Sequence, residues 1–302
     1  MNRPRRVHPR LCLSLVLLLA PVACDAKKDE GTTADGKSAT AKGETKSGEG
    51  KAGDPAAKAA PSSDLPSAES LLDKATVAQG GKDKIEQLQS LHLEGTVSVL
   101  SQNIGGDMKL WWKAGDFYSE QTMVGVGTVR AGKQGDVIWA DDPVSGLRTL
   151  TGIEAEQQAW ASSPSLPAQW QRYFTAARTV GKRELGGKPV YDVELTAKSG
   201  ATVTLSFDAD SGLQVAHQFK QQTPMGETPV TVELQDYREV QGFKMPYKQV
   251  MDIGIAKATQ TLTVVEIDVP VDASKFAKPT GGAEVAPAGA PAKAEPPAAP
   301  PP

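Results

Sequence analysis

The sequence has very little cysteine. Its only two cysteines, Cys12 and Cys24, both lie within the first 24 residues of a 302-residue chain. The rest of the chain therefore cannot form a disulfide, a thiolate metal site or a cysteine nucleophile. Any fold that it adopts has to be stabilised by core packing.

An excess of charge of one sign is also lacking. The chain has 33 basic and 36 acidic residues, which gives a net charge of -3. It lacks the basic patch by which proteins bind nucleic acid, and the positive field that attracts a protein to anionic lipid. We therefore expect no nucleic-acid partner.

Side chains suited to catalysis are scarce. Only two of the three histidines, His92 and His217, lie beyond the N-terminal region. His92 alternates with apolar residues and is expected to face solvent or the opposite side of its strand, and no carboxylate pattern surrounds His217. There is no glycine-rich phosphate loop, no HExxH motif and no Gly-x-Ser-x-Gly elbow. Asp210-Ser211-Gly212 matches the tripeptide of aspartic proteases, but it has no convincing second copy and is explained as a hairpin turn. The sequence predicts a non-enzymatic protein without a cofactor or a metal site.

Residues 1–23 have the composition of a signal peptide. Four arginines and no acid precede the apolar run 11–20, which is too short to cross a bilayer as a helix. The next residues, Ala20-Pro21-Val22-Ala23-Cys24, resemble the lipobox of bacterial lipoproteins, although Pro21 replaces the usual leucine-like residue. In a lipobox the cysteine thiol receives a diacylglyceryl group and becomes the mature N-terminus. The alternative is an ordinary signal peptide that contains a cysteine.

The lipobox resemblance implies an exported protein, anchored to a membrane through acyl chains on Cys24 and facing the periplasm. The choice between inner and outer membrane stays open. Residues 24–66 are rich in Lys, Glu, Gly, Ala and Ser without a hydrophobic period, which predicts a disordered linker. Residues 280–302 form an Ala/Pro-rich tail that we expect to be disordered as well. Residues 67–279 remain, enough for one folded domain.

The hydrophobic pattern of this domain changes from helical to strand-like. An amphipathic helix is expected from residue 67, with Leu71, Leu72, Ala75 and Ala78 on one side, followed by a helical turn over 82–88. Residues 153–160 and 166–178 also read as helices. The alternation of apolar and polar residues that is typical of half-buried antiparallel strands occurs in 91–99, 108–112, 117–123, 128–131, 137–140, 190–195, 202–208, 213–221, 229–237, 243–252 and 258–268.

This order of elements predicts an α+β fold. A large antiparallel sheet twists, and it curls over the helices that pack on it. We therefore expect a large curved antiparallel sheet that forms an incomplete β-barrel, with helices packed at its concave face.

Three segments resemble the lipoprotein-sorting family, the LolA- and LolB-like proteins. They are SLHLEGT at residues 90–96 (which follows a helix), FDADSGL at 207–213 and DYREVQGFKMP at 236–246. These segments mark turns and strand starts, so they bear on fold more than on function. The resemblance implies an open barrel that receives acyl chains on its concave face, with helices as a lid. The soluble carrier of that family has no lipid anchor, whereas its outer-membrane acceptor has one.

Large apolar residues are the candidates for lining such a cavity, although each could equally belong to a filled core. We expect the lining to include Met108, Trp112, Met123, Val126, Trp139, Trp160, Trp170 and Phe174. The first hypothesis is thus a membrane-anchored protein that binds lipid or lipoprotein acyl chains in envelope transport or sorting. The second is a structural or interaction module of the same fold, with a filled core and an unknown protein partner.

Overall fold

The structure is a computed structural model that describes residues 65–223 and 226–280, except the side chain of Leu100. The signal peptide, Cys24, the linker up to residue 64 and the tail from residue 281 lie outside the described residues.

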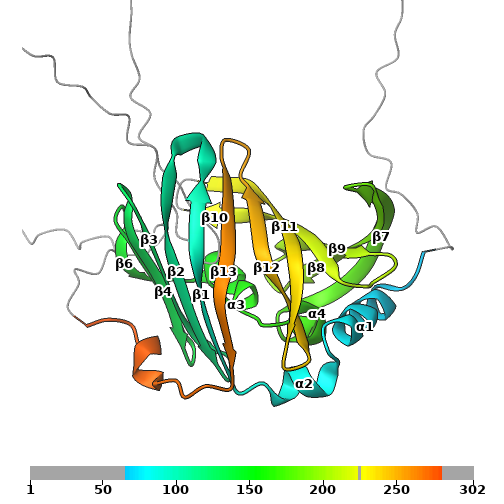
Figure 1. Ribbon diagram of the computed structural model, residues 1–302, viewed down its shortest axis with the longest axis horizontal. Helices are drawn as coiled ribbons and strands as arrows, with labels where there is room; N and C mark the ends of the chain where they lie inside the picture. The colour runs from blue at the N-terminus through cyan, green and yellow to red at the C-terminus, as the bar shows by residue number, and fades with distance from the viewer. Residues whose placement is uncertain (1–64, 224–225, 281–302) are drawn as a thin grey trace, which may run out of the picture.

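Thirteen antiparallel strands form a single sheet among these residues, and Figure 1 shows that it is strongly curved. Its order is β6-β5-β4-β3-β2-β1-β13-β12-β11-β10-β9-β8-β7, and the two edge strands, β6 and β7, do not pair with each other. The fold is therefore an incomplete barrel of the α+β class, as the sequence predicts. The strands are β1 (Ser90–Val99), β2 (Ile104–Lys113), β3 (Asp116–Met123), β4 (Gly127–Gln134), β5 (Val137–Asp142), β6 (Gly146–Thr149), β7 (Phe174–Leu185), β8 (Lys188–Ala197), β9 (Thr202–Asp208), β10 (Gln214–Thr223), β11 (Gly226–Val240), β12 (Phe243–Asp252) and β13 (Lys257–Ile267).

The first and last strands meet in the middle of the sheet. β1 pairs with β2 on one side and with β13 on the other. The pairing with β13 shifts register between Glu94 and Gly95. A Cβ atom at Gly95 would lie 2.3 Å from the carbonyl oxygen of Thr261, so only glycine allows this close approach of two backbones.

The helices lie at the ends of the sheet and within its curve. α1 (Ala68–Ala78) begins at Ser67, whose Oγ accepts a hydrogen bond from the backbone N of Ser70. α2 (Lys82–Gln87) follows it. α3 (Gly152–Ala161) and α4 (Leu166–Gln169) connect the edge strands β6 and β7, and Figure 1 shows them inside the curved sheet. A 3-10 turn, Ala273–Phe276, packs near β3 and β4 after the last strand.

Two expectations from the sequence need correction. The helix expected over 166–178 is wrong in its second half, because α4 ends at Gln169, a 3-10 turn covers Trp170–Arg172 and β7 begins at Phe174. Pairing of ten of the twelve residues of β7 with β8 overrides the helical spacing of its first apolar residues. The short strand β6 was not expected, since Ser145 and Gly146 read as a turn. The other expected strands are present, with β9 and β12 at the expected bounds.

Candidate ligand-binding pocket

A pocket of about 170 Å³ lies between the concave face of the sheet and the segment that connects α3 with α4. Strands β1, β2 and β10 to β13 supply one wall, and the residues from Trp160 to Pro167 supply the other. The lining consists of Gln79, Leu91, Leu93, Met108, Leu110, Trp112, Trp160, Ala161, Ser162, Ser163, Pro164, Ser165, Leu166, Pro167, Gln214, His217, Phe219, Leu234, Tyr237, Met245, Pro246, Tyr247, Gln249, Gln260 and Leu262.

The apolar wall follows from strand alternation. Side chains two residues apart point to the same face, so Met108, Leu110 and Trp112 of β2 all face inward. They lie beside inward residues of β1, since Leu93 pairs with Leu110 and Leu91 pairs with Trp112. All five are buried. Neighbouring strands therefore build a continuous apolar floor.

Trp160, near the end of α3, forms the facing wall. Its ring meets the ring of Phe219 edge to face, with centroids 5.0 Å apart and an interplanar angle of 90°. Phe174, at the start of β7, lies on another side with its ring centroid 6.2 Å away. Aromatic pairs of this geometry are favourable, so the indole is held in place against Phe219 of β10 and Phe174 of β7.

The connection between α3 and α4 is fastened to the end of α1. Ser165 Oγ donates a hydrogen bond of 2.6 Å to Gln79 Oε1, and both residues are buried. The backbone oxygen of Gln79 accepts from the backbone N of Lys244 at 2.8 Å. This chain of contacts joins the cover of the pocket to α1 and to β12.

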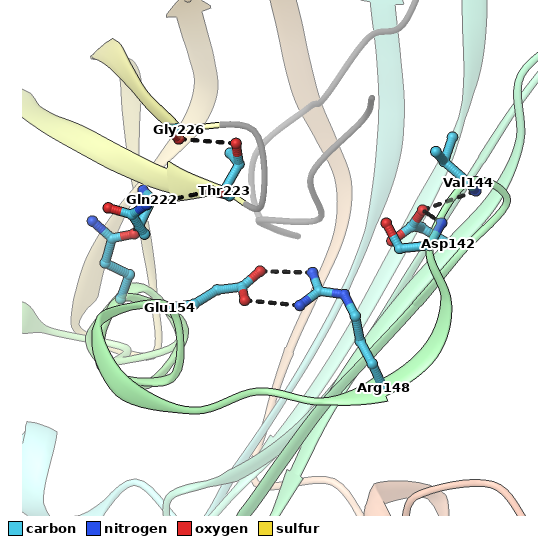
Figure 2. Close-up of polar contacts among 9 residues, drawn as sticks. Asp142, Val144, Arg148, Glu154, Gln222, Thr223 and Gly226 are labelled. Atoms are coloured by element: carbon cyan, nitrogen blue, oxygen red, sulfur yellow. Dashed lines mark hydrogen bonds and ion pairs between the residues drawn. The ribbon is translucent and has the colours of Figure 1, made fainter. Parts of the chain in front are cut away.

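α3 itself is attached at its other end by polar contacts, as Figure 2 shows. Arg148 of β6 donates two hydrogen bonds to Glu154, from Nη1 at 2.8 Å and from Nη2 at 2.6 Å. Gln157 Nε2 donates to the backbone oxygen of Lys220, and its Oε1 accepts from the backbone N of Gln222. The helix that carries Trp160 is thus held to β6 on one side and to β10 on the other.

One side of the pocket is polar but uncharged. Tyr237 Oη donates to the backbone oxygen of Gln214 at 2.6 Å, and burial raises the pKa of this phenol above its usual value. The Gln214 amide lies 3.3 Å from His217 Nδ1. Burial lowers the pKa of His217 to about 4, so its ring is neutral at pH 7. Gln249 and Gln260 complete this side, and the lining includes no Asp, Glu, Lys or Arg.

The structure brings three of the eight expected residues to the pocket, namely Met108, Trp112 and Trp160. Phe174 packs behind Trp160, and Met123 is in the core beyond the pocket. Val126 and Trp170 are partly buried against the same core.

Trp139 lies on the opposite, convex face. It alternates with Ile138 and Ala140, which belong to the core of the concave side. Its ring packs near Tyr118 with centroids 6.1 Å apart, and its Nε1 donates to the backbone oxygen of Phe276 at 3.0 Å. The turn that follows the last strand therefore buries Trp139 where the sheet would otherwise face solvent.

Several lining residues were not expected from the sequence. Gln249, Gln260 and Gln214 read as polar positions of half-buried strands, and His217 was considered only as a base or a metal ligand. An inward glutamine that alternates with apolar residues, as Gln260 does between Ala258 and Leu262, is the pattern that could have indicated them.

The motifs weighed for catalysis take structural positions. Asp208 Oδ1 accepts from both the backbone N and Oγ of Ser211, so the Asp-Ser-Gly segment is the turn between β9 and β10. His92 lies on the convex face, with its ring stacked on that of Trp111 at 4.9 Å and Nδ1 2.7 Å from Glu266 Oε2. Within residues 65–223 and 226–280 no group of three or more His, Cys, Asp or Glu side chains could hold a metal ion. No helix in the same ranges is long and apolar enough to cross a membrane.

The fold and the pocket together define a class: an open antiparallel half-barrel with a small uncharged pocket under a helical cover. No protein-family model matches the chain, and no curated protein matches it in sequence.

Solved structures of similar fold include a DUF1329 family protein from Desulfovibrio piger, at 13% identity over 70% of this chain and 97% of that one, with a TM-score of 0.48. A LolA superfamily protein from Nitrosomonas europaea has 12% identity over 71% and 99% of the two chains, with a TM-score of 0.49. A putative outer membrane lipoprotein-sorting protein domain from Vibrio parahaemolyticus has 9% identity over 69% and 95%, with a TM-score of 0.45. All three TM-scores lie at or below 0.49 and all three identities at or below 13%, so these likenesses establish neither the family nor the activity of this chain.

Proposed function

We propose that this chain is an exported lipoprotein, anchored through acyl chains on Cys24, whose domain at residues 67–279 binds acyl chains of lipids or lipoproteins in envelope transport or sorting. The domain acts as a binding protein, without a chemical step of its own.

The observation that carries this proposal is the apolar, uncharged pocket on the concave face. Met108, Trp112 and Trp160 line it, and no charged side chain does. Acyl chains need apolar area and few placed polar groups, and each buried methylene contributes about 0.8 kcal/mol. A lining of this kind suits them better than it suits a charged metabolite.

The size of the pocket indicates how much of a ligand it holds. Its volume is about 170 Å³, close to the ~150 Å³ of an engineered cavity that binds benzene and below the ~300 Å³ of small drug sites. The closed pocket thus accommodates a segment of one acyl chain. A complete chain enters when the connection between α3 and α4 moves outward, which breaks the bond between Ser165 and Gln79.

The anchor is supported by the sequence. The arginine-rich start, the short apolar run and the residues before Cys24 fit lipidation. We propose that residues 24–66 serve as the disordered linker that the sequence predicts; a linker of that length would have an average reach of about 35 Å, which would let the domain meet ligands away from the surface that holds it.

Two adjacent tryptophans give a matched test of acyl binding. Trp112 lines the pocket, whereas Trp111 lies on the other face of β2 against His92. The full chain with Cys24→Ser, stripped of lipid, would be incubated with phosphatidylethanolamine or a diacylglyceryl-cysteine peptide and weighed by native mass spectrometry. We expect a bound lipid in the parent protein and in Trp111→Ala, and at least a tenfold loss of binding in Trp112→Ala.

An apo mass for the parent protein after incubation, or equal binding by the two tryptophan variants, would overturn the proposal in favour of the interaction module. Circular dichroism of each variant checks that the sheet is intact.

The anchor is tested separately in cells. The unaltered chain should sediment with membranes and incorporate labelled palmitate, and Cys24→Ser should do neither. If Cys24→Ser sediments as before, the residues around Cys24 form an ordinary signal peptide and the anchor is wrong.

A further inference from the structure

The polar side of the pocket contains a pair of glutamines on neighbouring strands. Gln260 of β13 is directly opposite Gln249 of β12, and both line the pocket. Gln260 also pairs with Val97 of β1, so it lies at the centre of the sheet. Two amide side chains thus occupy paired positions on the inward face, beside the polar groups of Gln214, His217 and Tyr237.

Gln260 has a donor that the fold does not use. The residue is only 5% exposed, and its Nε2 has no hydrogen-bond partner among the described residues. A buried amide hydrogen without an acceptor costs free energy on the scale of a lost hydrogen bond, and most such groups in proteins are paired. Because Gln260 lines the pocket, an acceptor that enters the pocket from outside can satisfy this donor.

The surroundings define the charge of that acceptor. No Lys or Arg lines the pocket to neutralise a carboxylate or a phosphate. Gln249 pairs with Leu234 of β11, and His217 pairs with Val232, two residues away on the same strand. His217 is therefore displaced from Gln249 by two residues along the strand direction. Its neutral ring, 3.3 Å from the Gln214 amide, adds hydrogen-bonding capacity without charge. A buried charged group would be disfavoured here.

The apolar wall around Trp112 and the pair Gln249 and Gln260 lie at different positions along the strands. Val97 of β1 pairs with Gln260 of β13 on one side and with Gly106 of β2 on the other. Trp112 lies six residues further along β2 than Gly106. Six residues of a strand span about 20 Å. The pocket therefore contains an apolar wall around Trp112 and, further along the strands, the amides of Gln249 and Gln260, which matches a hydrocarbon chain that carries an uncharged acceptor.

We propose that Gln260 and Gln249 bind the carbonyl oxygen of a carboxylic ester or amide, so that the pocket selects esterified or N-acylated chains over free fatty acids and plain hydrocarbons. This inference rests on the proposed acyl binding and adds the polar group that the ligand carries. Phospholipids and the acylated cysteine of lipoproteins both supply such a carbonyl.

Three ligands with equal chains test the selection. The full chain with Cys24→Ser, stripped of lipid, would be titrated with methyl palmitate, palmitic acid and hexadecane while tryptophan fluorescence is followed. One hydrogen bond to Nε2 corresponds to about a 2- to 12-fold gain in affinity. We expect the parent protein to bind methyl palmitate more tightly than hexadecane by this factor, and palmitic acid at pH 8 more weakly than methyl palmitate.

Replacement of the glutamine isolates its contribution. Gln260→Leu should bind hexadecane as well as the parent does but lose the preference for the ester, whereas Gln218→Leu, on the exposed side of β10, should keep it. Because Gln260→Leu removes an unpaired buried donor, its melting temperature without ligand should equal or exceed that of the parent. A lower melting temperature would show that Nε2 has a structural partner and would overturn the inference.

The outcomes separate this inference from the proposed function. If Gln260→Leu keeps the parent's ratio of ester to hexadecane affinity, the carbonyl site is wrong and acyl binding stands. If the parent binds none of the three ligands, both fail. Dipalmitoyl phosphatidylethanolamine and an N-palmitoyl peptide, compared in the same titration, show which source of the carbonyl is preferred.

Discussion

The ion pair between Arg148 and Glu154 gives the sharpest prediction about stability. The two side chains are only 7% and 15% exposed and form a two-pronged contact (Figure 2). Arg148 Nε has no partner among the described residues. Glu154→Ala would therefore leave a buried guanidinium without its counter-charge, which costs about 3–5 kcal/mol in comparable cases. We expect about 3 kcal/mol here, since water can enter the space that the carboxylate leaves.

Replacement of both partners distinguishes the pair from its buried charge. The double variant Arg148→Met with Glu154→Leu should recover to within about 1 kcal/mol of the parent, because no unpaired charge remains. The measurement is urea unfolding followed by circular dichroism, and 3 kcal/mol corresponds to a fall of about 6–12 °C in melting temperature for a domain of this size.

Glu86→Ala is the matched control, because the pair of Glu86 with Lys82 is 63% and 71% exposed and contributes less than about 0.5 kcal/mol. A loss below about 1 kcal/mol in Glu154→Ala, or a double variant no more stable than Glu154→Ala, would refute the reasoning.

Two further predictions concern His217 and the close approach of β1 to β13 at Gly95. The pKa of His217 is about 4 in the folded protein, against an ordinary value of 6.5. The unfolded chain therefore binds the proton at a higher pH than the folded protein does, and the free energy of unfolding falls as the pH drops from 6.5 to 4. Between pH 7 and pH 5 this loss is about 2 kcal/mol. Urea unfolding of His217→Asn should show a pH profile flatter by that amount, and equal profiles would contradict the shift. Gly95→Ala should cost about 1–3 kcal/mol because its Cβ would lie 2.3 Å from the Thr261 carbonyl. Gly105→Ala, whose Cβ would lie 3.7 Å from the carbonyl oxygen of Val97, should change stability by less than about 0.5 kcal/mol. Equal effects of the two substitutions would disprove the close approach.

The strands were predictable where one face is buried and turns flank them. β9 and β12 alternate clearly and are bounded by Gly, Asp or Ser, so their limits follow from the sequence. The sequence of β7 does not alternate in this way, because β7 is an edge strand with no fully buried residue after Phe174. Trp170 and Phe174 have helical spacing but belong to different elements, a 3-10 turn and a strand. The pairing of β7 with β8, a hairpin that turns at Gly186 and Gly187, decides between these structures, and the apolar spacing of 170–178 by itself does not indicate it.

The pocket was predictable in its apolar half for the same reason. Residues an even number of positions apart on a strand share a face, so Met108 and Trp112 of β2 point to the same side. The alternation with polar residues indicates that this side is inward. Alternation could not indicate the face on which Trp139 lies, because both faces of β5 are covered, one by the core and one by the Ala273–Phe276 turn. The polar half needs a different criterion. Gln260 occupies an inward position of its strand, where an apolar residue is expected. A fold tolerates a polar residue at such a position where its side chain has a hydrogen-bond partner. In this chain the described residues supply no partner for Gln260 Nε2, and Gln260, unlike Gln121 and Gln221, also lines the pocket, which is why we propose a ligand acceptor for it.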